Sequence, residues 1–210
     1  MIKKILFDID GTLICNVDYI KYSTAAFYEY GIHDSDAIWT FNHSYEAYET
    51  AIGRYNRELF AKYMSNRIKW YLNQEFVDLL FKHLGKAVNG DSDKLKKMLD
   101  KFDKYELVIV SNFFEQVQKD RLTTLGIENY FSSYHGEDAC KPRLKPFIEA
   151  LGDTYPDECL MVGDRYDIDI KPAKTLGINT LQVGRDIDSV LDLTPEYIED
   201  IEDHLKMKTL

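Results

Sequence analysis

Short hydrophobic runs separated by segments of helical spacing constrain the fold of this 210-residue chain more than any other feature. The runs predict strands over residues 4–9, 107–111, 160–163 and 180–183, with a weaker fifth over 130–134. They are apolar throughout rather than alternating, which is typical of strands covered on both faces. Because helix-like stretches lie between them, parallel pairing in a layered α/β fold is expected.

Three of the connecting stretches predict helices, over residues 115–125, 145–151 and 168–176, and a glycine follows each of them. Glycine just past the end of a helix is an expected stop signal, because it accepts positive φ. Their alternation with the apolar runs strengthens the prediction of a parallel sheet.

One region, residues 14–88, breaks the alternation. It contains no convincing strand, and apolar residues recur three and four apart over residues 58–64 and 70–81. It also holds 16 of the 28 aromatic residues and both tryptophans. We interpret it as a helical insertion that packs as its own small bundle. The aromatic residues are typical of such a bundle's core, and a planar or apolar substrate pocket is the alternative.

Charge, hydrophobic runs and cysteine content limit the possible binding partners and the cellular location of the protein. The chain carries 26 basic and 36 acidic residues, a net charge of −10, which disfavours binding to nucleic acid. The longest uncharged run, residues 175–184, is too short to span a membrane. Three scattered cysteines indicate neither a disulfide framework nor a zinc site. The first residues lack a signal-peptide core, so a cytoplasmic protein is expected.

Paired acids end the first predicted strand, in the sequence Asp8-Ile9-Asp10-Gly11-Thr12. Alternation along the strand directs the side chains of Asp8 and Asp10 the same way, and Gly11 permits a sharp turn. The carboxyl ends of parallel strands are where α/β folds bind ligands. Two carboxylates there repel each other unless a cation or a proton intervenes.

A second acidic cluster, Asp164, Asp167 and Asp169, follows the predicted strand 160–163. If that strand lies beside the first, Asp164 comes near Asp8, and an oxygen-only ligand set suits Mg²⁺. The five histidines show no H-x-x-x-H spacing, which disfavours Zn²⁺. We interpret Asp167 as an acid at a helix N-terminus.

Four short patterns, taken in order, resemble the motifs of the haloacid dehalogenase (HAD) superfamily. They are Asp8-x-Asp10-Gly11-Thr12-Leu13, Ser111 after a hydrophobic strand, Lys141-Pro142, and Gly163-Asp164 with Asp169 five residues later. Each later motif is weak alone, but four in register are highly specific. The resemblance implies a Rossmann-like three-layer core with a mostly parallel sheet, formed by residues 1–13 and 89–210. Residues 14–88 then resemble the α-helical cap of cap-type-one members.

The resemblance also implies roles for individual residues. Asp8 matches the nucleophile that forms an aspartyl-phosphate, and Asp10 matches the general acid/base. Thr12 matches a residue that positions Asp10. Ser111 matches the hydroxyl that holds a phosphate oxygen, and Lys141 matches the cation that neutralises the phosphate and the nucleophile.

The implied metal is Mg²⁺, with Asp8, the backbone carbonyl of Asp10, and Asp164 as matching ligands. Asp169 matches the second acid of the last motif, which supports the metal shell. Asn112 is expected to offer its backbone or its amide to the phosphate.

Two positions depart from the pattern or compete within it. Lys145-Pro146 competes with Lys141-Pro142, but Lys141 fits better, because Phe147 stands six residues after it. We therefore expect Lys145 to be a surface residue at the start of a helix. Ile168 stands where the commoner family form has Asn.

The leading hypothesis is a Mg²⁺-dependent phosphatase acting on a small phosphorylated metabolite, a phosphomonoester. A phosphomutase of the same superfamily is the alternative, and a non-catalytic binding module is a weaker one. A dehalogenase is disfavoured, because those relatives lack the second Asp of the first motif. The cap residues considered for substrate contact are His43, Tyr45, Arg54, Tyr55 and Arg57. No feature indicates the oligomeric state.

Overall fold

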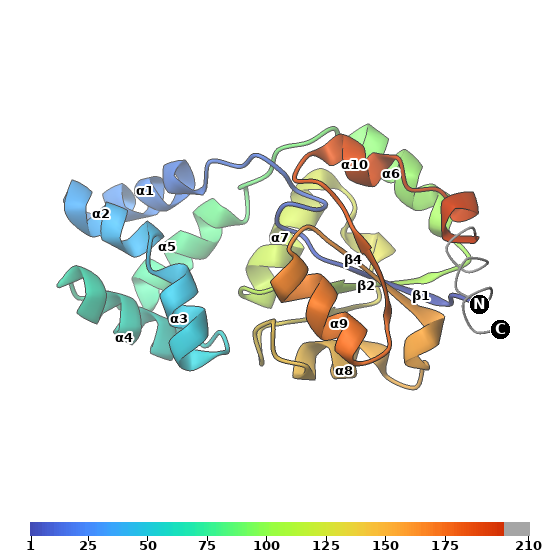
Figure 1. Cartoon of the computed structure of the whole chain (residues 1–210). Helices are drawn as coiled ribbons and strands as arrows, with labels where there is room; N and C mark the ends of the chain where they lie inside the picture. The colour runs from blue at the N-terminus through green and yellow to red at the C-terminus, as the bar shows by residue number, and fades with distance from the viewer. Residues whose placement is uncertain (200–210) are drawn as a thin grey trace.

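A computed structural model describes residues 1–199 of the chain, and its centre is one five-stranded parallel sheet (Figure 1). The strand order is β3-β2-β1-β4-β5. The strands are β1 (Lys4–Phe7), β2 (Glu106–Val110), β3 (Ser133–His135), β4 (Cys159–Gly163) and β5 (Asn179–Gln182). Leu6 of β1 pairs with Val108 on one side and with Met161 on the other. The strands that precede Asp8, Ser111 and Asp164 are therefore neighbours.

Helices cover both faces of the sheet, which makes a three-layer core. Ile5 and Phe7 pack with residues of α6 (Ser92–Leu99), α7 (Glu115–Leu125) and α10 (Ile187–Leu191). Leu6 points to the other face and packs with α8 (Lys145–Leu151) and α9 (Lys171–Thr175). The period of two along β1 thus supplies both layers, and the predicted α/β fold class is confirmed.

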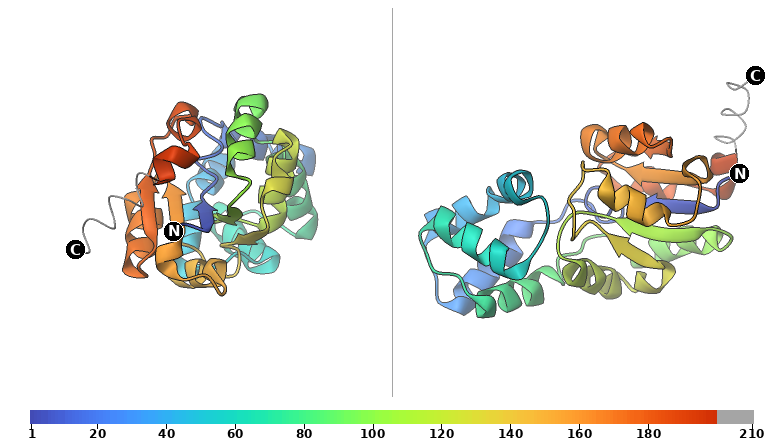
Figure 2. Two further views of the ribbon diagram at one scale, coloured as in Figure 1. Left: turned by 90° about the vertical axis from the view of Figure 1, so that its right-hand side faces the viewer. Right: turned by 90° about the horizontal axis from the view of Figure 1, so that it is seen from below.

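Five helices separate β1 from the rest of the core and form a second lobe (Figure 2). They are α1 (Tyr19–Tyr30), α2 (Ser35–Asn42), α3 (Tyr45–Ile52), α4 (Arg57–Ile68) and α5 (Gln74–Leu84). Four of them begin after an Asp or Asn whose side chain accepts a hydrogen bond from the first turn: Asp18, Asp34, Asn56 and Asn73. We call this lobe the helical cap.

The cap packs around its own aromatic centre. Phe41 is fully buried there, and its ring contacts Phe27, Phe60 and Phe76 at centroid distances of 4.9, 5.9 and 5.6 Å. The aromatic richness of residues 14–88 is therefore mainly a packing feature. Ile14, at the edge of the predicted insertion, packs instead with the sheet.

Backbone hydrogen bonds and one shared apolar cluster join the cap to the core. The Tyr55 N–H donates to the Glu137 carbonyl at 2.7 Å, and the Cys140 N–H donates to the Gly53 carbonyl at 2.8 Å. The core residue Phe114 is 1% exposed and belongs to the aromatic cluster of the cap.

Most elements lie where the sequence predicts them, and the differences concern short elements. The weak strand over 130–134 begins later, at Ser133, because residues 128–130 form a 3₁₀ turn. The helix expected over 168–176 is divided into a π-helical turn, Tyr166–Ile170, and α9. The predicted core segment 89–210 includes residues 200–210, which lie outside the described residues. Within residues 1–199, no helix is long and apolar enough to span a bilayer.

Candidate active site

The end of β1 places two aspartates at the carboxyl edge of the sheet. The Asp8 N–H continues the ladder to the Val162 carbonyl at 3.0 Å, and the chain then turns back through Asp10. Gly11 adopts a φ of 86°, and a Cβ there would lie 2.7 Å from a carboxylate oxygen of Asp164. This turn therefore requires glycine on both conformational and steric grounds.

Lys141 joins the acids of the first and last motifs. Its Nζ donates to Asp8 Oδ1 at 2.7 Å and to Asp169 Oδ1 at 2.6 Å. The other oxygen of Asp169 accepts the Arg165 N–H at 3.0 Å. The side chains of Lys141, Asp8 and Asp169 are almost fully buried, since their exposed fractions are 8% or less. The cluster is thus a buried, hydrogen-bonded arrangement of opposite charges.

The same cluster fits a divalent cation. Oxygen atoms of Asp8, Asp164 and Asp169 lie within 4.8 Å of one another. Asp164 Oδ2 accepts a hydrogen bond from Arg185 Nε at 2.7 Å, whereas Oδ1 is buried with no hydrogen-bond partner among residues 1–199. An orphaned carboxylate oxygen beside two other acids is the donor that an oxygen-seeking ion such as Mg²⁺ requires.

The pKa values of Asp8 and Lys141 are both raised, for different physical reasons. Burial raises the pKa of Asp8, and the nearby carboxylates of Asp169 and Asp10 add to the rise against the pull of Lys141. Burial alone would lower the pKa of Lys141, but Asp8 and Asp169 outweigh it and raise that pKa. A cation added at this site would favour the ionised form of Asp8, the form that can act as a nucleophile.

Ser111 and Asn112 follow β2 and face the same edge. Ser111 Oγ accepts a hydrogen bond from Gln118 Nε2 at 3.1 Å. The amide of Asn112 clamps the backbone of Lys141, because Oδ1 accepts its N–H at 2.7 Å and Nδ2 donates to its carbonyl at 3.2 Å. The side-chain amide of Asn112 therefore positions Lys141, and the phosphate contact expected of Asn112 remains a prediction for its backbone.

The Asp10 side chain is 40% exposed and is held by groups that the motif does not contain. Arg121 donates to both of its oxygens, at 2.8 and 3.2 Å, and the Tyr19 hydroxyl donates to Oδ1. Burial alone would raise the pKa of Asp10, but the charge and hydrogen bonds of Arg121 outweigh it and lower that pKa. Thr12 Oγ1, expected to position Asp10, is buried with no hydrogen-bond partner in the described part of the chain.

Sequence reasoning missed Tyr19, Gln118, Arg121 and Arg185. Gln118 and Arg121 stand three apart on α7, so they share a helix face, and both are almost fully buried. A Gln and an Arg at this spacing are ordinarily read as a solvated face. Only the placement of α7 beside the end of β1 shows that they point inward.

Two competing assignments separate clearly in space. Lys145, the rival of Lys141, begins α8 with a 57% exposed side chain and lies 3.4 Å from Glu149. Asp167 is exposed, whereas Asp169 is fully buried. In both cases the residue favoured from the sequence lies in the buried cluster and its competitor lies at the surface.

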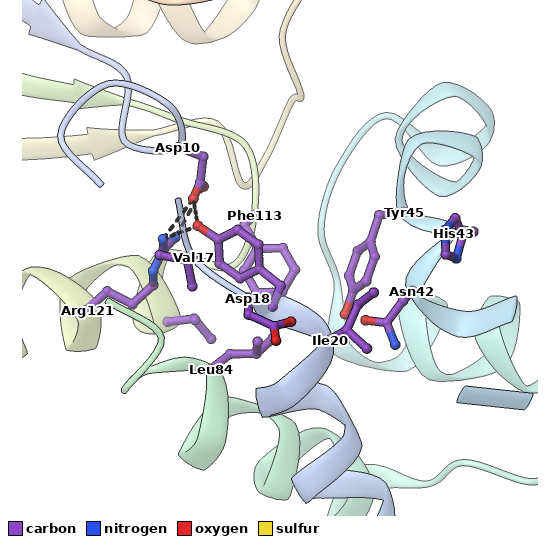
Figure 3. Close-up of a pocket in the computed structure, with 12 residues that line it drawn as sticks. Asp10, Val17, Asp18, Ile20, Asn42, His43, Tyr45, Leu84, Phe113 and Arg121 are labelled. Atoms are coloured by element: carbon purple, nitrogen blue, oxygen red, sulfur yellow. Dashed lines mark hydrogen bonds and ion pairs between the residues drawn. The ribbon is translucent and has the colours of Figure 1, made fainter. Parts of the chain in front are cut away.

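A cavity of about 490 Å³ lies between Asp10 and the cap (Figure 3). Tyr45 and His43, from the cap, line its far side, and Arg121 and Phe113 line the side of the core. The other three cap residues considered from the sequence lie elsewhere. Tyr55 donates to Glu49 at 2.7 Å, Arg57 pairs with Asp78 at 2.7 Å, and Arg54 is outside the lining.

Comparisons with known proteins agree with this geometry. A family model described as haloacid dehalogenase-like hydrolase matches residues 2–177. A Clostridium perfringens protein named provisionally as the pyrophosphatase PpaX is 30% identical over 190 residues, which cover 87% of this chain and 84% of that protein. A phosphoglycolate phosphatase of Aquifex aeolicus is 28% identical over 190 residues, covering 84% and 82%.

Solved structures share the fold. A HAD family enzyme from Bacteroides thetaiotaomicron, a variant in complex with magnesium and inorganic phosphate, superposes with a TM-score of 0.60 at 19% identity. The match covers 88% of this chain and 95% of that one.

Proposed function

The chain belongs to the haloacid dehalogenase-like hydrolases, and from this premise we propose that it is a Mg²⁺-dependent phosphatase of small phosphomonoesters. The observation that carries the proposal is Lys141, whose Nζ lies 2.7 Å from Asp8 and 2.6 Å from Asp169. A buried cation beside a buried carboxylate, with an orphaned oxygen of Asp164 close by, suits the attack of an acid on an anionic phosphate.

In the proposed first step, Asp8 supplies the attacking oxygen. Its Oδ1 is held by Lys141, so Oδ2 forms the bond to phosphorus while the bond from phosphorus to the leaving oxygen breaks. Ser111 and Lys141 hold the phosphate oxygens. Asp10, on the cavity side, gives its proton to the leaving oxygen.

In the proposed second step, Asp10 takes a proton from water, and the water oxygen attacks the phosphorus of the aspartyl-phosphate. Phosphate leaves and Asp8 is restored. Arg121 favours ionised Asp10, which suits this second step. The first step needs the proton, so Asp10 takes up a proton from solvent before it donates to the leaving oxygen, while its carboxyl oxygens keep their contacts with Arg121.

Asp8, the Asp10 carbonyl and Asp164 would hold Mg²⁺, with Asp169 as support. The ion supplies positive charge that screens the phosphate from the attacking carboxylate. Arg185, whose side chain is 70% exposed, occupies one oxygen of Asp164 and can withdraw toward solvent.

The test is phosphate release from a panel of phosphomonoesters, with Mg²⁺ and with a chelator. We expect release only with Mg²⁺, and we expect Asp8→Asn to reduce it to background. Release that is independent of the metal, or that survives in Asp8→Asn, would contradict the proposal. Isomerised sugar phosphate without free phosphate would identify a phosphomutase instead.

A further inference from the structure

The cavity beside Asp10 has aromatic walls that come from both lobes (Figure 3). Tyr45 of the cap and Phe113 of the core approach to a centroid distance of 5.8 Å. Tyr19, at the start of α1, adds a third ring. The volume of about 490 Å³ lies within the range of small-molecule sites, ~300–1,000 Å³.

The backbone of Phe113 is strained. Its φ is 112°, a value that bulky residues rarely adopt and that costs about 1–3 kcal/mol. The strained turn directs two consecutive rings toward the cap, with Phe114 in the aromatic cluster and Phe113 at the cavity. Strained backbone conformations cluster at functional sites, so the strain at Phe113 favours a functional role for its ring on the cavity wall.

Arg121 places a guanidinium on the cavity wall, and all of its hydrogen-bond donors already have partners within the protein. Its five N–H groups donate to both oxygens of Asp10, to the Tyr19 hydroxyl, to Gln118 Oε1 and to the Ala87 carbonyl. A guanidinium has five N–H donors, so none remains for a carboxylate or a phosphate of a substrate.

The other ionisable side chains of the cavity wall do not favour the binding of an anion either. Asp18 contributes a carboxylate that accepts a hydrogen bond from the Lys21 N–H. His43 Nδ1 lies 2.8 Å from the Trp39 carbonyl and donates to it, so this nitrogen is not available to a ligand. An anionic leaving group would therefore face the carboxylate of Asp18, while the guanidinium of Arg121 has no unused donor to offer it.

Two polar atoms of the wall remain available. The Tyr45 hydroxyl has no hydrogen-bond partner among residues 1–199. Asn42 Nδ2 donates one hydrogen to the Ile38 carbonyl at 2.8 Å and keeps the other. They can recognise a neutral polar substituent on an otherwise apolar ligand.

Resting on the proposed phosphatase function, we propose that the substrate carries a planar, largely apolar leaving group without negative charge, with one ring or two fused rings. This differs from glycolate and phosphate, the anionic leaving groups that the names of two relatives denote. The specificity comes from aromatic contact with the ring and from repulsion of anions by Asp18.

The test compares benzyl phosphate with 4-carboxybenzyl phosphate, which differ by one carboxylate. We expect kcat/KM for benzyl phosphate to exceed that for the carboxylated ester by about tenfold or more. Equal values, or a preference for the carboxylated ester, would overturn the inference and leave the proposed function standing. Failure to hydrolyse any ester with Mg²⁺ present would overturn both.

Two substitutions test the named wall residues. Asp18→Asn keeps an N-cap side chain and removes the charge, so the discrimination against 4-carboxybenzyl phosphate should fall about threefold or more. Tyr45→Leu should lower kcat/KM for benzyl phosphate about three- to tenfold relative to methyl phosphate. Tyr71→Leu, at a 78% exposed cap position, is the control and should change neither ratio. Unchanged ratios in Asp18→Asn and Tyr45→Leu would overturn the inference.

Discussion

The carboxyl edge of the sheet and the cavity under the cap meet at Asp10, yet they are built in opposite ways. The edge gathers charged groups that lie within a few residues of strand ends, and Lys141 binds two of its acids directly. The cavity is walled mainly by aromatic and aliphatic side chains from the helices of the cap, from α7 and from the loop after β2. Under the proposed function, the chemical step would depend on the sheet and substrate choice would depend on the cap.

After the loss expected of Asp8→Asn, replacing Asp10 should have the largest effect on rate, and it tests the carboxyl edge. Asp10→Asn removes the proton donor and acceptor, so we expect kcat to fall about 10²–10⁴-fold. Binding of phosphate and Mg²⁺, measured by calorimetry, should be retained, because the ligand set of Asp8 and Asp164 is intact. Normal turnover in this variant would assign the acid/base role elsewhere.

Replacing Lys141 tests the edge through stability. Lys141→Ala leaves Asp8 and Asp169 buried without their cation, so the free energy of unfolding should fall by about 3–5 kcal/mol in denaturant titrations without metal. We also expect weaker phosphate binding and slower turnover. Lys145→Ala, at the exposed start of α8, should stay within about 0.5 kcal/mol. Similar losses of stability in both variants would contradict the role of Lys141 as the cation that pairs with the buried acids.

Tyr19 and Tyr45 test the distinction between the carboxyl edge of the sheet and the cavity under the cap. Tyr19 bonds to Asp10 and Arg121, so Tyr19→Phe should lower the free energy of unfolding by about 1.5–3 kcal/mol. The hydroxyl of Tyr45 faces the cavity without a partner in the described residues, so Tyr45→Phe should change stability by less than about 0.5 kcal/mol. Thermal unfolding of the two variants provides the comparison. Equal losses of stability would contradict the distinction between the hydrogen-bonded hydroxyl of Tyr19 and the unpartnered hydroxyl of Tyr45.

The smallest expected effect is a pH dependence at Glu49, which reaches from the cap to Asn112 at 3.0 Å. Burial raises the pKa of Glu49 more than hydrogen bonds from Tyr55 and Asn112 lower it. The folded protein therefore binds this proton more tightly than the unfolded chain does. Its contribution to stability is complete at acid pH and is lost as pH rises through the raised pKa.

Glu49→Gln should remove this dependence. We expect the variant to gain stability over the wild type as pH rises from about 4 toward neutrality, and to match it at the acid end. Denaturant titrations across that range measure the difference. A constant difference at every pH would contradict the assignment.

The sequence predicts the edge well and the cavity poorly, for a physical reason. Asp8, Asp10 and Asp164 directly follow strands, and parallel pairing brings the ends of neighbouring strands together without knowledge of packing. The partners of Asp10 come from helix faces. Arg121 and Tyr19 are 102 residues apart, and only the docking of cap and core unites them.

The same limit applies to the cap. Its aromatic content predicts a bundle, and Phe41 and Phe76 meet this expectation by packing with each other. The content does not reveal that Tyr45 and Phe113 face a cavity, because a ring on a cavity wall and a ring in a core have the same spacing in the sequence. Phe113 also depends on a positive φ that no residue preference predicts.

The central claim is that the phosphoryl group passes through Asp8. The most direct measurement mixes the enzyme with Mg²⁺ and a phosphomonoester that it hydrolyses, stops the reaction with acid within the first turnover, and maps the peptides by mass spectrometry. We predict a phosphoryl group on the peptide that contains Asp8, and none in Asp8→Asn. Phosphate release with Asp8 unmodified throughout the first turnover would contradict the account.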